Sequence, residues 1–567
     1  MKKFEFKGVL MGLLVVVACA GEMQRIVAQD SLEVTFVGTR ELHVRDAIKQ
    51  GDYPQAVELD IKKTAASYTE LPIIAALQPL TLEIEPSRLA LDAPIPRLYP
   101  GYIKGGFGLH TTPLVGIQYG DMRSRDGSWN VAYNHLSSQQ GAALIEGLDD
   151  GFSHHDAGVW MRRFVGKKSL DGGLSWSRDA FGVYGLDTSQ SALADTARVR
   201  YQQFGGRLTL ENHLRDSSDL HFSATLRATH LGSRAGAQNT VVGTDFTLHT
   251  YKNSDRLQLD ATMDYDQLTN DSTVLEERAV PSRALIGLNP SISRGRGNLN
   301  VLIGAGLWVD ARGAQSFHFY PRAEARYSFF DDLFVPYAGV GGGMERLTLL
   351  DLVERNPYVQ YRGQNMRHTN RALNFHGGVR GALARNLEFN AEVRTTRLRD
   401  RAYFINDSLD GAGQRFSISY DTLTVARVMG EIAFHGEALD VSAKAEFFTY
   451  SALEGHAWYL PRVKWSTDVH WAFNDEFTLR GSGAWVSGRQ APSYLPFDAA
   501  PESVDESGLY TVQLPGYVDV SLEVEYRYNK RLAVWGRVAG LTASEFARWN
   551  GYPVQPFQAI LGLSYRF

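Results

Sequence analysis

Hydrophobic and polar residues alternate along most of the chain from residue 102 onward. Segment 518–528 shows the pattern most clearly, with valine, leucine or tyrosine at every even position and mostly charged residues between them. The same alternation returns at 220–228, 257–265 and 463–473. Successive side chains of a β-strand point to opposite faces, so each of these segments predicts a strand with one apolar and one polar face.

The lengths of the strands and of their connections decide between a soluble sandwich and a membrane barrel. The alternating segments run about 8 to 12 residues, near the 9 to 11 that a tilted strand needs to cross hydrocarbon. Short connections fall at 167–168, 331–332, 384–386, 474–476 and 529–530, and long ones at 137–156, 266–282, 344–371, 398–423 and 488–517. Outer-membrane barrels sort their loops in this way. We therefore predict an all-β fold, a closed antiparallel transmembrane β-barrel of about 22 strands within a range of about 16 to 22.

Composition excludes several other classes of protein. The chain has 54 Gly, 28 Phe, 26 Tyr and 10 Trp but only one Cys, so an internal disulfide is impossible. Its 58 basic and 63 acidic side chains nearly balance, whereas a nucleic-acid binder would be basic. No apolar run beyond the N-terminus reaches the roughly 18 to 20 residues of a spanning helix. We therefore expect neither a nucleic-acid partner nor a helical membrane protein.

The first 29 residues have the form of a signal peptide. Three lysines precede the apolar stretch 9–20, which is too short to anchor the chain in a membrane. Ala28 offers a cleavage site, which we favour over an earlier one at Ala18 or Ala20. Residues 16–19 also resemble a bacterial lipobox, in which Cys19 would be lipidated; the alternative is that Cys19 is removed with the signal.

The end of the chain carries a second targeting feature. In segment 559–567 the side chains of Leu561, Leu563, Tyr565 and Phe567 share one face, and the last residue is aromatic. This segment resembles the C-terminal signal by which outer-membrane barrels engage the barrel-assembly machinery; the alternative is an ordinary last strand. Because a barrel must pair its last strand with its first, we expect 557–567 to pair with 101–109 in outer-membrane lipid.

Two stretches resemble TonB-dependent outer-membrane receptors. The hairpin at 540–567 is similar to the closing hairpin of those receptors, and segment 32–40 resembles their TonB-box region. Segments 98–108, 111–113, 135–138, 457–461 and 488–489 resemble a group of Bacteroidota barrels described as TonB-receptor-like. The resemblance implies the outer membrane of a Gram-negative bacterium and TonB as a candidate partner.

The chain departs from that family before the barrel. Receptors of this kind carry a larger plug domain, but only about 70 residues lie here between Asp30 and Tyr99. We therefore divide the chain into a signal peptide at 1–29, a periplasmic tail or reduced plug at 30–100 and the barrel at 101–567. The alternative for 30–100 is a simple linker, and whether TonB is engaged stays open.

The sequence offers no convincing catalytic, cofactor or metal site. His154, His155 and Asp156 fall in a predicted outer loop without a third histidine at zinc-site spacing, so solvated loop polarity is the better interpretation. The glycines at 339–343 lack the lysine and helix of a phosphate-binding loop. A Ser–His pair at the outer rim is conceivable, but no residue order selects one, and we predict that the chain is not an enzyme.

Aromatic and arginine side chains in the long loops are the candidate recognition residues. Such side chains offer large contact areas and charged hydrogen bonds. They are Tyr358, Tyr361, Arg362, Arg367, Trp458 and Tyr459. The alternative is that these loops pack on one another over the pore.

Two functions fit this sequence. The first is an outer-membrane receptor or transporter-like barrel that binds or passes a solute through its extracellular loops and lumen. The second is a barrel without a plug that serves as a structural subunit of an outer-membrane assembly or export complex. The place of residues 30–100 would discriminate between them, and we expect these residues to lie mostly at the periplasmic mouth.

Overall fold

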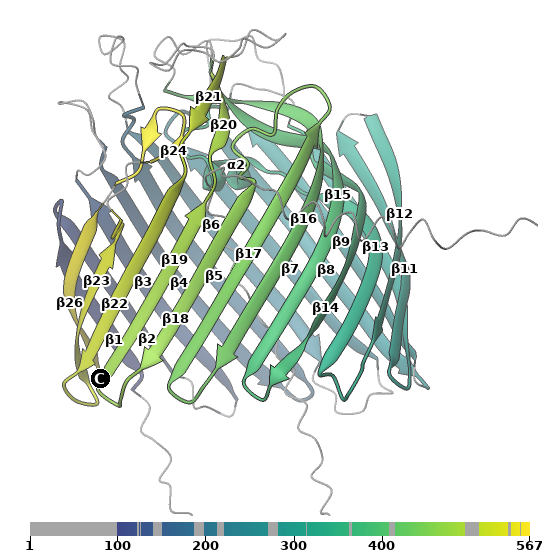
Figure 1. Ribbon diagram of the computed structural model, residues 1–567, viewed down its shortest axis with the longest axis horizontal. Coiled ribbons are helices and arrows are strands. Elements are labelled where there is room, and N and C mark those ends of the chain that lie inside the picture. Colours follow the sequence, from purple (N-terminus) through teal and green to yellow (C-terminus); the bar gives the residue numbers. More distant parts are fainter. Residues whose placement is uncertain are drawn as a thin grey trace, which may run out of the picture. The chain divides into compact units, whose positions relative to one another are not determined.

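The described part of the computed structural model begins at Tyr99, so the signal peptide and the predicted tail lie outside the described residues. The structure describes residues 99–567 apart from 122–123, 125, 140–149, 186–197, 213–219, 254, 270–281, 313, 362–365, 408–413, 494–509, 543–545 and 556. Within this part, 22 strands form one antiparallel sheet that closes on itself (Figure 1). The predicted fold class and strand number are confirmed.

The strands of the barrel follow the order of the chain, each one pairing with its predecessor. They are β1 Gly101–Gly108, β2 Thr112–Asp121, β3 Gly127–Ser138, β4 Phe152–Val165, β5 Lys168–Phe181, β6 Val199–Asn212, β7 His221–Ser233, β8 Gln238–Lys252, β9 Asp255–Thr269, β10 Arg283–Arg296, β11 Leu299–Arg312, β12 Ala314–Tyr327, β13 Phe334–Glu345, β14 Thr369–Ala384, β15 Leu387–Asn406, β16 Phe416–His435, β17 Leu439–Ala452, β18 Val463–Ala472, β19 Phe477–Val486, β22 Tyr517–Arg527, β23 Leu532–Ala539 and β26 Gln558–Arg566. Two small hairpins, β20 Arg489–Ser493 with β21 Tyr510–Leu514 and β24 Ala547–Trp549 with β25 Tyr552–Pro553, belong to the loops.

The seam of the barrel joins the first strand to the last. β1 pairs with β26 from Tyr102 opposite Arg566 to Gly108 opposite Ile560. Beyond this ladder, the N–H of Gly101 donates to the Phe567 carbonyl at 3.1 Å, and the N–H of Phe567 donates back at 3.0 Å. A Cβ at residue 101 would lie 2.3 Å from the tip of the Phe567 ring, so a side chain there would displace that ring. The expected pairing of 557–567 with 101–109 is confirmed.

The short and long connections predicted from the sequence lie at opposite ends of the barrel, although the β1–β2 and β7–β8 connections, at the same end as the long loops, are also short. The five short connections are turns at one end, which we call the short-turn end, and the long connections lie at the other, the long-loop end. One predicted loop is shorter than expected: β15 and β16 are 20 residues each and extend well into 398–423. These two strands continue past the others because their outer ends, including Tyr403 and Phe404, are buried among the loops.

The wall has an apolar outer face and a polar inner face. On β22, Val518, Leu522 and Val524 are exposed, as expected of side chains that face lipid. Glu523 lies on the opposite face, where its carboxylate is 3.4 Å from the ammonium of Lys104 on β1 and 3.0 Å from the guanidinium of Arg480 on β19. The alternation read from the sequence thus separates lipid contacts from charges in the lumen.

The main hydrophobic core lies among the loops of the long-loop end rather than in the barrel wall. Helix α2 (Leu349–Arg355) is at its centre and buries Leu349, Leu352 and Val353. Thr348 caps the helix: its hydroxyl accepts from the N–H of Asp351 at 3.2 Å, and its own N–H donates to the Asp351 carboxylate at 2.7 Å. Figure 1 shows α2 within the outline of the barrel, beneath β20, β21 and β24. No helix among the described residues is long and apolar enough to span a membrane.

The orientation of the side chains on β22 gives a first prediction. Placing arginine at Leu522, in the middle of the strand, should destabilise the barrel by about 2 to 4 kcal/mol because a charge would enter hydrocarbon. The matched variant is Ser521→Arg, on the inner face beside Glu523, where the cost should be far smaller. Urea unfolding in lipid vesicles, followed by heat-modifiable gel migration, measures both, and equal losses would contradict the assignment of the faces.

The seam gives a second prediction. Deleting Phe567 removes both hydrogen bonds to Gly101 and leaves backbone groups unpaired, at a cost of several kcal/mol for each buried group. We expect a large fall in the fraction of chain that inserts as a folded barrel. Tyr528→Ala removes another exposed aromatic at the short-turn end, away from the seam, and should insert nearly normally. Normal insertion of the truncated chain would refute the role of this residue in closure.

Candidate functional site

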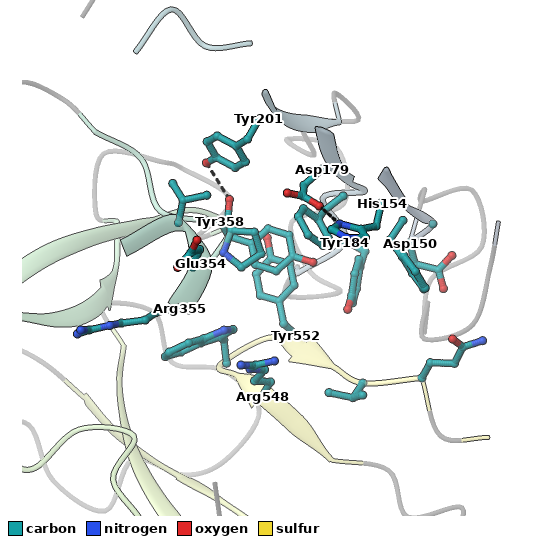
Figure 2. Close-up of a pocket in the computed structure, with 18 of the residues that line it drawn as sticks. Asp150, His154, Asp179, Tyr184, Tyr201, Glu354, Arg355, Tyr358, Arg548 and Tyr552 are labelled. Atoms are coloured by element: carbon teal, nitrogen blue, oxygen red, sulfur yellow. Dashed lines mark hydrogen bonds and ion pairs between the residues drawn. The ribbon is translucent and has the colours of Figure 1, made fainter. Parts of the chain in front are cut away.

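A cavity of about 720 Å³ lies inside the barrel at the long-loop end. Strands β4, β5 and β6 form one wall, the ends of β22, β23 and β26 form another, and α2 and the β24–β25 hairpin complete the enclosure. Among its lining residues are Asp150, His154, Asp179, Tyr184, Tyr201, Glu354, Arg355, Tyr358, Arg548 and Tyr552, which Figure 2 labels. The site therefore draws on residues that are about 400 positions apart in the chain.

Three tyrosines hold the loops around the cavity together. The rings of Tyr358 and Tyr552 stack with their centroids 3.7 Å apart. Tyr184 contacts both rings edge to face, with centroid distances of 6.3 Å to Tyr358 and 5.1 Å to Tyr552. The Tyr184 hydroxyl donates to the Pro553 carbonyl at 2.9 Å. Burial raises the pKa of Tyr184 to about 12, so its phenol stays neutral and remains a donor. The stack therefore covers one face of Tyr358 and one face of Tyr552.

His154 lies between two carboxylates on the wall of the cavity. Its Nδ1 contacts Asp179, and its Nε2 is 2.9 Å from Asp156 (Figure 2 shows the contact with Asp179). An ionised carboxylate only accepts hydrogen bonds, so both ring nitrogens must carry protons to satisfy this arrangement. His154 is thus held as a cation that two anions already neutralise.

Glu354 has a different environment, in the last turn of α2. Its side chain is exposed to the cavity, and among the described residues it forms no hydrogen bond or ion pair. Burial and the negative charges of Asp351 and Asp179 raise the pKa of Glu354, against weaker opposing effects of Arg355 and Arg346. The Glu354 carboxyl group therefore experiences more negative than positive charge and has no hydrogen-bond or ion-pair partner among the described residues.

The segment that carries α2 is fastened to the barrel wall from several sides. The Tyr201 hydroxyl on β6 donates to the Pro357 carbonyl at 2.9 Å. Arg346 reaches Asp264 on β9 at 3.1 Å. At the start of β10, buried Arg283 pairs with Asp266 and also donates to the Met366 carbonyl at 3.3 Å. These contacts hold the inward loop, which we define as the described residues 346–361 and 366–368, across the outer end of the lumen.

The recognition residues predicted from the sequence occupy different places. Tyr358, Tyr361, Trp458 and Tyr459 are buried in the loop core, each less than 8% exposed, and of these only Tyr358 lines the cavity. Arg367 is exposed and binds Asp400, with its guanidinium 2.9 Å from that carboxylate. Arg362 lies outside the described residues. Loop-on-loop packing thus accounts for most of these side chains, and a direct role in recognition stays a prediction.

The terminal residues predicted as an assembly signal share one outward face. Leu561, Leu563, Tyr565 and Phe567 are between 41% and 67% exposed on the outside of the seam. An exposed apolar row at the barrel edge is accessible to a protein that guides closure, and the same row faces lipid after insertion. Its recognition by an assembly machinery remains a prediction.

Sequence reasoning missed most of the cavity. It noticed His154, His155 and Asp156 but placed them in a loop, whereas they belong to strand β4. Strand alternation then separates the two histidines: His154 faces the cavity, and the ring of His155 contacts that of His135. The period-two pattern of the apolar part of this strand, if extended toward the N-terminus, would have placed residues 154–156 in the strand. No local signal identifies Glu354 or Tyr552.

Among the described residues, no group of three or more His, Cys, Asp or Glu side chains is arranged to hold a metal ion. The polar groups of the cavity can instead offer hydrogen bonds and charge to a bound solute. Its volume falls within the roughly 300 to 1,000 Å³ typical of small-molecule sites. The cavity therefore has the volume and the polar lining of a small-molecule site.

Comparisons with known proteins identify the class of fold. No family model and no curated protein matches the chain. Among solved structures, it is similar to the FrpB iron transporter of Neisseria meningitidis, with a TM-score of 0.63 at 10% identity over 83% of this chain and 82% of that one. The chain thus has the fold of TonB-dependent outer-membrane receptors.

Two further structures have the same fold. The ferripyoverdine receptor of Pseudomonas aeruginosa has a TM-score of 0.60 at 11% identity, covering 84% of this chain and 72% of that one. The ferric-catecholate import receptor Fiu of Escherichia coli K12 has a TM-score of 0.58 at 11% identity, covering 83% and 82%. At identities this low, the TM-scores establish a shared fold and nothing more specific.

The anchoring of the inward loop gives a third prediction. Replacing Arg283 by methionine leaves Asp266 buried without its cation, and breaking a buried pair in this way costs about 3 to 5 kcal/mol. We expect the inward loop to loosen while the barrel stays closed. Limited proteolysis of the folded protein should then cut between residues 346 and 361 in the variant and not in the wild type.

The double variant Arg283→Met with Asp266→Leu provides the control. It removes both charges, so no buried ion is left unpaired, and much of the loss should be recovered. If the single and double variants were equally resistant to protease, the ion pair would not anchor the loop.

Proposed function

We propose that this chain is a receptor or transporter-like barrel of a Gram-negative outer membrane, which binds a solute in the cavity at the long-loop end of its lumen. One observation carries the proposal: the cavity of about 720 Å³ is bordered by the loop core, and the Glu354 side chain in it forms no hydrogen bond or ion pair among the described residues. An ionisable side chain that lines a pocket of this size can orient a bound solute through hydrogen bonds.

The fold supports this proposal over a catalytic one. The proteins of similar fold reported above are transport receptors. The iron-containing substrates named for those receptors are properties of those proteins, and we do not propose iron as the substrate of this chain. We propose that the chain performs no catalysis and that its long-loop end takes up the solute first.

The partners follow from the same reasoning. We propose that the outer apolar band contacts outer-membrane lipid and that the final strand is read by the barrel-assembly machinery. TonB is a plausible partner because TonB-dependent receptors share this fold. Its docking segment would be 32–40, which lies outside the described residues.

A cavity-filling substitution gives the fourth prediction. Ser177 lines the cavity from β5, and its hydroxyl forms no hydrogen bond among the described residues, so Ser177→Trp should fill much of the space without breaking a side-chain hydrogen bond. The protein is purified from native membranes, denatured, and its released small molecules are identified by mass spectrometry. We expect a solute that is enriched with the wild type and reduced at least about ten-fold with the variant.

The matched control is Ser223→Trp, a serine on β7 that does not line the cavity. This variant should keep the enriched solute. Equal recovery from Ser177→Trp and the wild type would exclude the cavity as the site. If neither protein released any enriched solute, the structural-subunit function would become the better explanation.

A further inference from the structure

The outer face of strands β3–β7 carries basic side chains but no acidic ones. Alternation places the acidic residues of these strands on the lumen face, together with residues that line the cavity; they are Asp156, Asp171, Asp179 and Glu211. The basic residues of the outer face are His135, His155, Arg163, Lys168, Arg178, Arg200 and His230. The outside of this part of the wall is therefore positive, whereas charges of both signs face the lumen.

Four of these basic residues are neighbours at the long-loop end, and we call them the outer basic patch. His135 of β3 is directly opposite His155 of β4, and His155 is directly opposite Arg178 of β5. The two imidazole rings contact each other, with their Nδ1 atoms 3.2 Å apart. Arg200 of β6 is diagonal to Arg178 on the same face, a position at which Cα atoms are roughly 7 to 8 Å apart. The patch thus brings two arginines and two histidines together across four strands.

The arginines of the patch have no counter-charge in the described part of the protein. Neither the Arg178 guanidinium nor the Arg200 guanidinium forms a hydrogen bond or ion pair there, and the Nε atom of Arg200 is buried without a partner. On the inner face of the same strands, in contrast, Arg162 pairs with Asp171. Two unneutralised guanidinium groups this close together repel each other, and an anion that contacts both removes the repulsion.

The patch lies at the boundary between the outer apolar band and the long loops. Toward the short-turn end, the same face continues in exposed apolar side chains, which include Val131, Val159, Leu174 and Phe204. Tyr133 and Trp176 lie directly between this band and the patch, each two residues from a patch residue on its own strand. Tyrosine and tryptophan collect at the level of the lipid headgroups. A lipid whose acyl chains contact the apolar band therefore has its headgroup beside the patch.

We propose that the outer basic patch binds the phosphorylated headgroup of a lipid in the outer leaflet, with Arg178 and Arg200 as its phosphate contacts. Long loops of outer-membrane barrels are extracellular, which places the patch in that leaflet. Guanidinium groups bind phosphate through paired, charge-assisted hydrogen bonds. A lipid is favoured over free phosphate because the same face offers an apolar surface to acyl chains. The patch faces away from the cavity, so this inference goes beyond the proposed function and does not depend on it.

Two lipids that differ only in phosphate test the proposal. One is lipid A with both of its phosphates, and the other is lipid A from which the phosphates have been removed. Each is titrated in mixed micelles into the full chain in an uncharged detergent, and native mass spectrometry measures the bound fraction. We expect the phosphorylated lipid to bind at least about ten-fold more tightly. The double variant Arg178→Gln with Arg200→Gln should remove most of that difference.

The matched control is Arg163→Gln with Lys168→Gln, which removes two cations from the outer face of β4 and β5 near the short-turn end. This variant should keep the preference for the phosphorylated lipid, and heat-modifiable migration verifies that each variant is folded. If the two lipids bound equally well, if neither bound, or if both double variants lost the preference alike, the inference would be wrong.

Two further measurements separate a lipid on the outer wall from other sources of phosphate and other places. Inorganic phosphate in large excess should leave the lipid bound, because it lacks acyl chains; displacement would overturn the choice of a lipid. Ser177→Trp changes the opposite face of β5 and should leave lipid binding unaltered. Loss of lipid binding in that variant would place the lipid in the lumen and refute the outer patch.

Discussion

The need to satisfy every backbone hydrogen bond in hydrocarbon is the constraint on which this structure depends. A sheet in lipid cannot leave an edge unpaired, and here β1 and β26 close it, with reciprocal bonds between Gly101 and Phe567 completing the seam. In a closed barrel the side chains of each strand point alternately outward to lipid and inward to the lumen. All later features, including the charged interior and the loop core, follow from this closed wall.

A barrel of 22 strands encloses a lumen too wide for its own side chains to fill. At the long-loop end the loops supply the missing core: α2 buries its apolar face among them, and the tyrosine cluster joins segments from distant parts of the chain. The anchors at Arg283 and Tyr201 turn the inward loop into a fixed part of the wall. The cavity is the space that this core and the wall leave between them.

The charges of the lumen fall into two groups. Along the wall several are paired, as where Arg427 bridges Glu392 at 2.5 Å and Glu446 at 3.1 Å. Such networks satisfy buried ions and hold neighbouring strands in register. In the cavity Glu354 has no such partner among the described residues. This contrast between paired charges on the wall and the Glu354 carboxylate, more than the shape of the cavity, is our reason for proposing that a solute binds there.

The sequence by itself determined the strands, their faces, the sorting of the loops and the pairing of the chain's last strand with residues 101–109. These features were predictable because alternation and turn length are local properties, and closure then follows from the unpaired edges alone. The tertiary structure decided that Trp458 and Tyr459 would be buried, that His154 would lie in a strand beside Asp179, and that Glu354 would face the same cavity. No local pattern encodes these neighbours, because they come from loops far apart in the chain that meet only when the closed wall brings them to one end.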